Sequence, residues 1–266
     1  MVSLAPTRPS GDFQALLEPL LALAQQGREL TGSVVDKFSG AGREHKLVRF
    51  HFAGPPAGHD PIQLGLFAGV HGDEPTGSAA LVEFLTALAA TPARAAGYEL
   101  WAYPVVNPSG YHAGTRETCT GKDLNREFWR DSTEPEIRMI EAELLARRFD
   151  GLVTLHADDT CEGLYGYSHG QTLDEMLLGP ALTAAEGVLP RDRRAVIDGF
   201  SAREGVICDC FKGILAPPPG QNPRPFNLIF ETPARAPFTA QVAAMVAALD
   251  TIIARYRGFI AHAQYL

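Results

Sequence analysis

Hydrophobic and polar positions form two alternating kinds of pattern along the chain. Apolar residues at helical spacing predict helices at residues 12–29, 76–90, 133–149, 172–186 and 238–256. Apolar or alternating runs predict strands between them, at residues 45–54, 62–69, 98–106, 150–158 and 226–233. Strands and helices therefore follow one another almost throughout the sequence.

This order of elements predicts an α/β fold. Parallel strands need crossover connections, and these are usually helices that cover the faces of the sheet. We therefore expect a mixed, largely parallel, doubly wound sheet with helices on both faces. No repeat or linker divides the sequence, so residues 1–266 are expected to form one domain, with residues 1–45 as an N-terminal extension of helix and strand.

Loops and one helix start also have local signatures. Residues 107–132 carry Gly, Pro, Asn and Thr with little periodicity, and a loop of that length in a compact domain is usually functional. Thr133 and Glu136 resemble a capping box, with Pro135 in the first turn of the helix. Residues 216–225 should be irregular, because prolines cannot donate hydrogen bonds to a sheet.

Composition excludes several classes of protein. The net charge of −8 and the absence of a Lys/Arg-rich run argue against nucleic acid or an anionic membrane as a partner. No run approaches about 18 uninterrupted apolar residues and the start lacks a signal-peptide pattern, so we expect no transmembrane helix and a cytoplasmic protein. The cysteines are too few and too unevenly spaced for a disulfide scaffold, and reduced thiols are expected at Cys119, Cys161, Cys208 and Cys210.

Polar side chains with catalytic potential follow the predicted strands. They are His71, Asp73, Glu74, Asn107, His156, Asp158 and Glu231. In open α/β sheets, ligands bind in the crevice beyond the carboxyl ends of the strands. We therefore expect these side chains to converge on one crevice.

Two histidines and one acid in this set have the chemistry of a metal site. His71 and Glu74, with two residues between them, lie in a tight turn, and His156 would add a second imidazole. Two histidines and a glutamate with one open position are a typical ligand set of catalytic zinc. The alternative is structural: Asp73 and Glu74 as acids in a first helical turn, and His156 as a hydrogen-bonded histidine.

A second polar cluster lies on the long loop, at Arg116, Asp123, Asn125 and Arg126. Guanidinium groups near a metal can grip a carboxylate or polarise a carbonyl. Asp123 could accept the second ring N–H of a ligand histidine, as outer-shell acids do. It is equally suited to an Asx-turn that caps the loop.

Together these motifs resemble the zinc metallocarboxypeptidases of the carboxypeptidase A-like family. The resemblance rests on HxxE at His71 and Glu74, NPSG at 107–110, DLNREF at 123–128, His156, and Glu231 in FETP. It extends from about His51 to the C-terminal helix and implies a zinc carboxypeptidase-like fold. It also implies that one Zn²⁺ ion is held by His71, Glu74 and His156.

The resemblance further implies roles for the remaining polar residues. Glu231 matches the general acid/base, and Arg116 matches the arginine that polarises the scissile carbonyl. Asn125 and Arg126 match the pair that grips the terminal carboxylate of the substrate, and Asp123 matches the acid behind the first histidine. The family commonly has a mobile tyrosine before the catalytic glutamate, but no tyrosine lies between Ser201 and Glu231.

Three functions follow as expectations. The first is a metallocarboxypeptidase that hydrolyses small peptides with a free carboxylate, such as cell-wall peptides. The second is a zinc-dependent deacylase of N-acyl amino acids, of the related aspartoacylase and succinylglutamate desuccinylase group. Gly110 in NPSG and the long segment between His156 and Glu231 favour the peptidase. The third is a non-catalytic binding protein, which the presence of every ligand and of the base disfavours.

Overall fold

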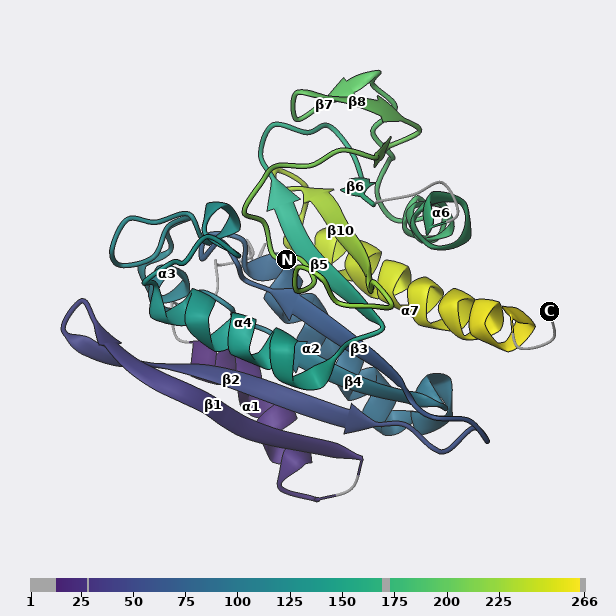
Figure 1. Cartoon of the computed structure of the whole chain (residues 1–266). Coiled ribbons are helices and arrows are strands. Elements are labelled where there is room, and N and C mark those ends of the chain that lie inside the picture. The colour runs from purple at the N-terminus through teal and green to yellow at the C-terminus, as the bar shows by residue number, and fades with distance from the viewer. Residues whose placement is uncertain (1–12, 28, 169–172, 264–266) are drawn as a thin grey trace, which may run out of the picture.

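A mixed sheet forms the centre of the computed structural model, which describes residues 13–27, 29–168 and 173–263 (Figure 1). Within these residues the sheet has ten strands in the order β1-β2-β4-β3-β5-β10-β6-β9-β8-β7. The strands are β1 (Leu30–Gly40), β2 (Arg43–Ala53), β3 (Ile62–Ala68), β4 (Tyr98–Tyr103), β5 (Gly151–Asp158), β6 (Tyr165–Tyr167), β7 (Val196–Ile197), β8 (Phe200–Arg203), β9 (Val206–Ile207) and β10 (Phe226–Pro233).

Helices lie on both faces of this sheet. They are α1 (Phe13–Ala24), α2 (Pro75–Ala90), α3 (Pro108–Ala113), α4 (Pro135–Arg147), α6 (Gly179–Ala185) and α7 (Phe238–Ala263), with short turns η1 (Pro92–Ala95), η2 (Leu124–Arg126) and η3 (Asp174–Leu178). In Figure 1, α4 lies in front of the sheet, and α1, α2 and α7 lie behind it. The predicted α/β class with helices on both faces is confirmed.

The centre of the sheet is parallel and its two sides are antiparallel. Strands β4, β3, β5 and β10 run parallel to one another, whereas β1 and β2 pair antiparallel with their neighbours, and β6 pairs antiparallel with β10 but parallel with β9. The parallel strands are apolar and almost fully buried, as expected when helices cover both faces. Their carboxyl ends therefore share one edge of the sheet.

Alternation along β5 and β10 separates two apolar layers. Val153, Leu155, Leu228 and Phe230 point into the core formed with α1, α2, α6 and α7. Leu152 faces the second core, which includes α4 residues. Because neighbours along a strand point to opposite faces, His156 and Glu231 lie on the same face as Leu152.

Three local predictions differ from the structure. Residues 30–40 form β1, an edge strand that is mostly exposed and so lacks an apolar pattern. Residues 107–132 contain α3 and η2 within the expected loop. The capping box before α4 is wrong: Glu134 is the residue that precedes the helix, and Glu136 instead accepts a hydrogen bond from Ser109, far along the chain.

The predicted helix starts at residues 12 and 172, and residue 28 within the first predicted helix, lie outside the described part of the chain, and α1 ends at Ala24, before the predicted end at residue 29. The other helices and the irregular segment 216–225 appear where the pattern predicts them, and Pro135 lies in the first turn of α4. In the described structure the four cysteines form no disulfide bond with one another.

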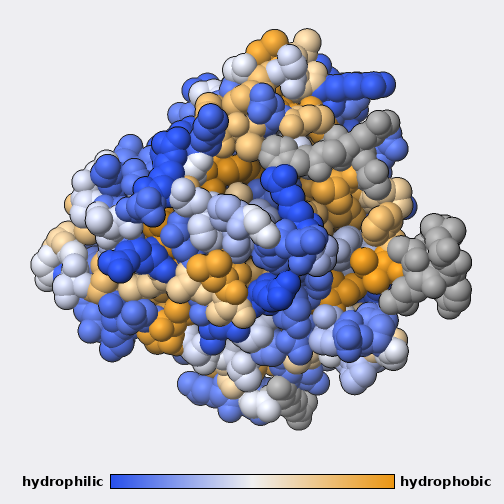
Figure 2. All heavy atoms as spheres, viewed as in Figure 1, coloured by the Kyte–Doolittle hydropathy of each residue, from blue (hydrophilic) through white to orange (hydrophobic). Residues whose placement is uncertain are grey.

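Helix α7 is long and apolar enough to cross a membrane by length and composition, over Phe238–Ile260. Its inward side chains are packed in the core behind the sheet, with Met245 and Leu249 almost completely buried. A core helix of this length passes the same test as a membrane span. Figure 2 shows hydrophilic side chains over much of the visible face, with the apolar ones in separate groups.

We expect Leu249→Ala to lower the free energy of unfolding by about 2–5 kcal/mol, because it leaves a cavity between α7 and the sheet. Arg255→Ala on the exposed side of the same helix should change it by less than about 0.5 kcal/mol. Urea denaturation of both variants measures this difference. Equal stabilities would contradict the packing of α7 in the core.

Candidate metal centre and active-site crevice

A cavity of about 530 Å³ opens at the carboxyl ends of the parallel strands. It brings together residues from most of the motifs named in the sequence, whereas Asn107, Asp123 and His156 lie outside its lining. The predicted residues among its lining are His71, Asp73, Glu74, Arg116, Asn125, Arg126, Asp158 and Glu231. The expected convergence of polar strand ends on one crevice is therefore present in the structure.

The turn after β3 is built on close backbone packing. Gly69 has a φ of +60°, and a Cβ on Gly72 would lie 1.9 Å from the carbonyl carbon of Gly110. Asn107 caps α3 through the backbone N–H of Gly110, at 2.7 Å. The NPSG motif thus forms the surface on which the turn carrying His71 rests.

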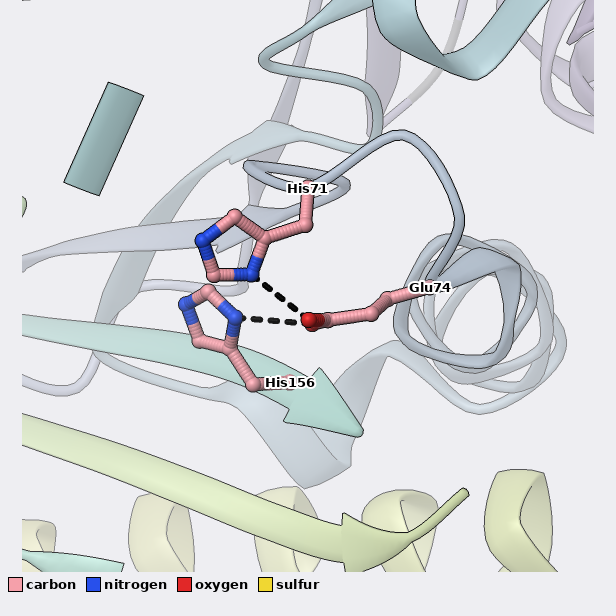
Figure 3. Close-up of side chains that lie close together, drawn as sticks. All are labelled: His71, Glu74 and His156. Carbon is pink, nitrogen blue, oxygen red and sulfur yellow. Dashed lines mark hydrogen bonds and ion pairs between the residues drawn. The ribbon is translucent and has the colours of Figure 1, made fainter. Parts of the chain in front are cut away.

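Glu74 joins the two histidines. Its Oε1 lies 2.6 Å from His71 Nδ1, and its Oε2 lies 2.8 Å from His156 Nδ1 (Figure 3). The backbone N–H of Ala157 also donates to Oε2, at 3.1 Å. One ligand atom from each of the three side chains lies within 4.8 Å of the others, so the cluster can hold a single metal ion.

Mutual interactions shift the titration of these groups. Burial alone would raise the pKa of Glu74, but the charges of His71 and His156 and their hydrogen bonds hold it below its ordinary value. Burial opposes protonation of His71, yet Glu74 and Asp123 together raise its pKa to about 9. For His156, burial outweighs Glu74 and lowers the pKa.

Residues of the long loop contact the Nε2 atoms of the two histidines, whose Nδ1 atoms contact Glu74. Asp123 Oδ1 lies 3.2 Å from His71 Nε2, the contact that a ligand histidine usually makes with a carboxylate. Asn125 Nδ2 lies 3.2 Å from His156 Nε2, and its Oδ1 accepts from the backbone N–H of Leu215 at 3.1 Å. Both imidazoles are therefore oriented by side chains behind them.

Arg116 is held by the same aspartate. Its Nε and Nη2 donate to Asp123 Oδ2 at 3.1 and 3.0 Å. This leaves Nη1 directed at the cluster, 3.3 Å from His71 Nδ1 and 3.6 Å from Glu74 Oε1. Arg126 donates to its neighbour's carbonyl, Asn125 O, and lies over the ring of Phe211 at 4.2 Å.

Glu231 lies beside the cluster. It pairs with His156 across the parallel strands β5 and β10, so both side chains share one face. Its Oε2 is buried and has no hydrogen-bond partner among the described residues. Burial, Glu74, Asp158 and Asp198 raise its pKa well above the ordinary value.

The lining also includes residues that sequence reasoning did not assign to the site. Tyr165, Tyr167, Asp198 and Phe211 form a wall from β6, from the β7–β8 hairpin and from the segment after β9. The Asp-Gly pair at 198–199 between short apolar pairs is a hairpin signal in the sequence. Its position at the cavity follows only from the tertiary fold.

The sheet is similar to that of the carboxypeptidases, and its edge carries a His–Glu–His cluster that can hold one metal ion. Residues 61–158, which span His71, Glu74 and His156, match the family model described as the succinylglutamate desuccinylase/aspartoacylase catalytic domain. Among curated proteins, no sequence matches the chain significantly.

Solved structures are similar over most of the chain. A candidate metallopeptidase from Shewanella denitrificans is 25% identical, with a TM-score of 0.75 over 96% of this chain and 98% of that one. A second one, from Shewanella amazonensis, is 24% identical with a TM-score of 0.75 over 92% and 93%. A metallo-carboxypeptidase from Burkholderia cenocepacia is 17% identical, with a TM-score of 0.68 over 92% and 68%.

Metal binding should release a proton. With a pKa of about 9, His71 holds a proton at neutral pH in the metal-free protein, and a metal ion must displace it. We expect about one proton released per zinc ion near pH 7.5, and an affinity that rises about tenfold per pH unit until pH approaches the His71 pKa. Calorimetric titration of chelator-treated protein in two buffers with different ionisation heats measures this. Identical heats in both buffers would contradict it.

Asp123→Asn should lower zinc affinity about 10- to 100-fold, because it weakens the support of His71 Nε2. Asp73→Asn is the matched control. It removes the same charge from near the same cluster, but Asp73 makes no hydrogen bond to either histidine in the described structure. Competition with a chromogenic chelator measures both affinities. An Asp123→Asn affinity equal to that of the control would refute the supporting role.

Proposed function

We propose that this protein is a zinc-dependent hydrolase that cleaves an amide bond next to a free carboxylate, as a metallocarboxypeptidase of small peptides. The observation that carries the proposal is Glu231. It is a buried carboxylate with a partnerless oxygen, on the strand beside His156 and facing the same cavity as the metal cluster. Because none of the described residues bonds to this buried oxygen, it is available to a reacting molecule.

His71, Glu74 and His156 would hold the ion. Zinc at such a site polarises carbonyl groups and lowers the pKa of water to about 7. Glu231 accepts the proton of the attacking water and then delivers it to the leaving nitrogen. A raised pKa suits this exchange, since a group that both takes and gives a proton works best near the operating pH.

Each of the two arginines stabilises a different negative charge of the substrate. Nη1 of Arg116 contacts His71 and Glu74 at the metal cluster, which places it to stabilise a developing oxyanion on the substrate carbonyl. Arg126 lines the cavity and binds the terminal carboxylate of the substrate. Asn125 is already bonded at both ends of its amide, to His156 and Leu215, and its first contribution is to position His156 and this loop.

A deacylase of N-acyl amino acids is the second candidate. It uses the same ligands, base and carboxylate-binding arginine, and the family match over residues 61–158 favours it. The solved structures that cover almost the whole chain support the peptidase instead, since two of them carry a metallopeptidase description. Both functions require an amide bond beside a free carboxylate.

Glu231→Gln tests the base. We expect kcat to fall about 10²- to 10⁴-fold, because the variant cannot accept the proton of water, while zinc content stays at one ion per chain. Elemental analysis and steady-state kinetics measure the two effects separately. A wild-type kcat in a Glu231→Gln variant that holds one zinc ion per chain would refute the role of Glu231 as the base.

A side-by-side substrate screen tests the reaction class. Zinc-loaded protein is offered a dipeptide, an N-acetyl amino acid and a murein peptide, each with a free carboxylate and as the C-terminal amide. The proposal expects cleavage of a peptide with a free carboxylate and loss of that cleavage in the amide. Cleavage of the N-acetyl amino acid alone would select the deacylase.

A further inference from the structure

The wall of the cavity formed by β6 and the β7–β8 hairpin carries two aspartates, each held by a tyrosine. Tyr167 Oη donates to Asp198 Oδ2 at 2.5 Å, and Tyr165 Oη donates to Asp158 Oδ2 at 3.0 Å. All four side chains line the cavity. The paired residues of β6 and β10 place Tyr165 beside Glu231, so this wall adjoins the proposed base.

Neither aspartate has a cationic partner. Among the described residues, no arginine, lysine or histidine forms an ion pair with Asp158 or Asp198. The other hydrogen bonds to the Asp158 carboxylate come from Thr160, which is neutral. The tyrosine hydroxyls therefore fix the orientation of both carboxylates and leave their negative charge uncompensated.

The cavity lining carries more carboxylates than guanidinium groups. Its carboxylates are Asp73, Glu74, Asp158, Asp159, Asp198 and Glu231, and its guanidinium groups are Arg116 and Arg126. A divalent ion in the His–Glu–His cluster would still leave the lining negative. A substrate carboxylate bound by Arg126 adds a further negative charge, so a positive charge elsewhere on the substrate would be favoured.

A purely local reason for Asp198 also exists. Asp198 and Gly199 have φ values of +49° and +80°, as a two-residue type I′ hairpin turn requires, and Asp-Gly is a common pair there. The turn does not explain the hydrogen bond from Tyr167, which comes from a different strand 31 residues away. It also does not explain the unpaired buried oxygen of Glu231 on the same cavity, which points to a bound polar molecule.

We infer that the cavity binds an amino acid whose side chain ends in an ammonium or guanidinium group, and that Asp198, with Asp158, receives this group. The inference rests on the proposed function and narrows its substrate to peptides that release a cationic amino acid. Substrates that release glutamate or aspartate would meet like charges on this wall.

The test compares lysine with norleucine, which has the same chain without the ammonium. Benzoyl-glycyl-lysine and benzoyl-glycyl-norleucine are offered to the zinc-loaded wild type and to Asp198→Asn. For the wild type we expect kcat/KM to be roughly 10- to 100-fold higher with the lysine substrate than with the norleucine substrate. This is the gain that one hydrogen bond between charged groups provides. In Asp198→Asn this ratio should fall toward one, mainly through KM for the lysine substrate.

The variants separate this role from folding. Asn-Gly suits a type I′ turn as well as Asp-Gly does, so Asp198→Asn should keep the wild-type melting temperature. Tyr167→Phe removes the hydrogen bond to the Asp198 carboxylate but keeps its charge. It should therefore reduce the lysine-to-norleucine ratio by a smaller factor than Asp198→Asn does. Glu204→Gln, an equal charge change on an exposed residue next to β8, is the control and should keep the full ratio.

A wild-type ratio near one, or an unchanged ratio in Asp198→Asn, overturns the inference. If neither peptide is cleaved, the proposed function fails, and the wall is tested by calorimetric binding of lysine and norleucine themselves. Tighter binding of lysine that Asp198→Asn abolishes would then support the cationic subsite without the peptidase. Equal binding of both would reject it.

Discussion

The carboxylate of Glu74 is the interaction on which the site depends. It is buried between two imidazoles and also accepts the N–H of Ala157, so it joins the turn after β3 to the end of β5. A buried charge is costly unless it is paired and hydrogen-bonded, and here both requirements are met by residues of the metal cluster itself. The same bonds that stabilise this carboxylate therefore bring the metal ligands to one point.

Behind these ligands the structure is a chain of oriented polar groups. Asp123 contacts both His71 and Arg116, and Asn125 connects His156 to the backbone of Leu215. Gly213 packs directly on Arg126, where a Cβ would lie 2.4 Å from the carbonyl oxygen. The segment after β9 is thus fitted to the loop that carries the proposed substrate-binding residues.

Much of the fold and the ligand cluster could be predicted from the sequence, for physical reasons. Strands β3, β5 and β10 are apolar on both faces, so a histidine or glutamate at their ends stands out against the pattern. Parallel strands end at one edge, which alone brings His71, His156 and Glu231 together. The chemistry of the side chains then indicates a metal.

The remaining parts depend on contacts between distant residues. Strand β1 is mostly exposed and has no apolar period, and β6 to β9 are two to four residues long. Glu136 bonds to Ser109 rather than to the start of its own helix, which no local pattern indicates. The wall carrying Asp198 arises in the same way, since only the folded sheet places the hairpin at the cavity.

The order of the ligands along the chain has a consequence for synthesis. His71 and Glu74 leave the ribosome together on one turn, but β5 must be inserted beside β3 before His156 completes the set. Glu231 arrives later still, with β10. Because domains are made from the N-terminus onward, the three proposed metal ligands are synthesised before the proposed base, which reaches them only when β10 pairs with β5.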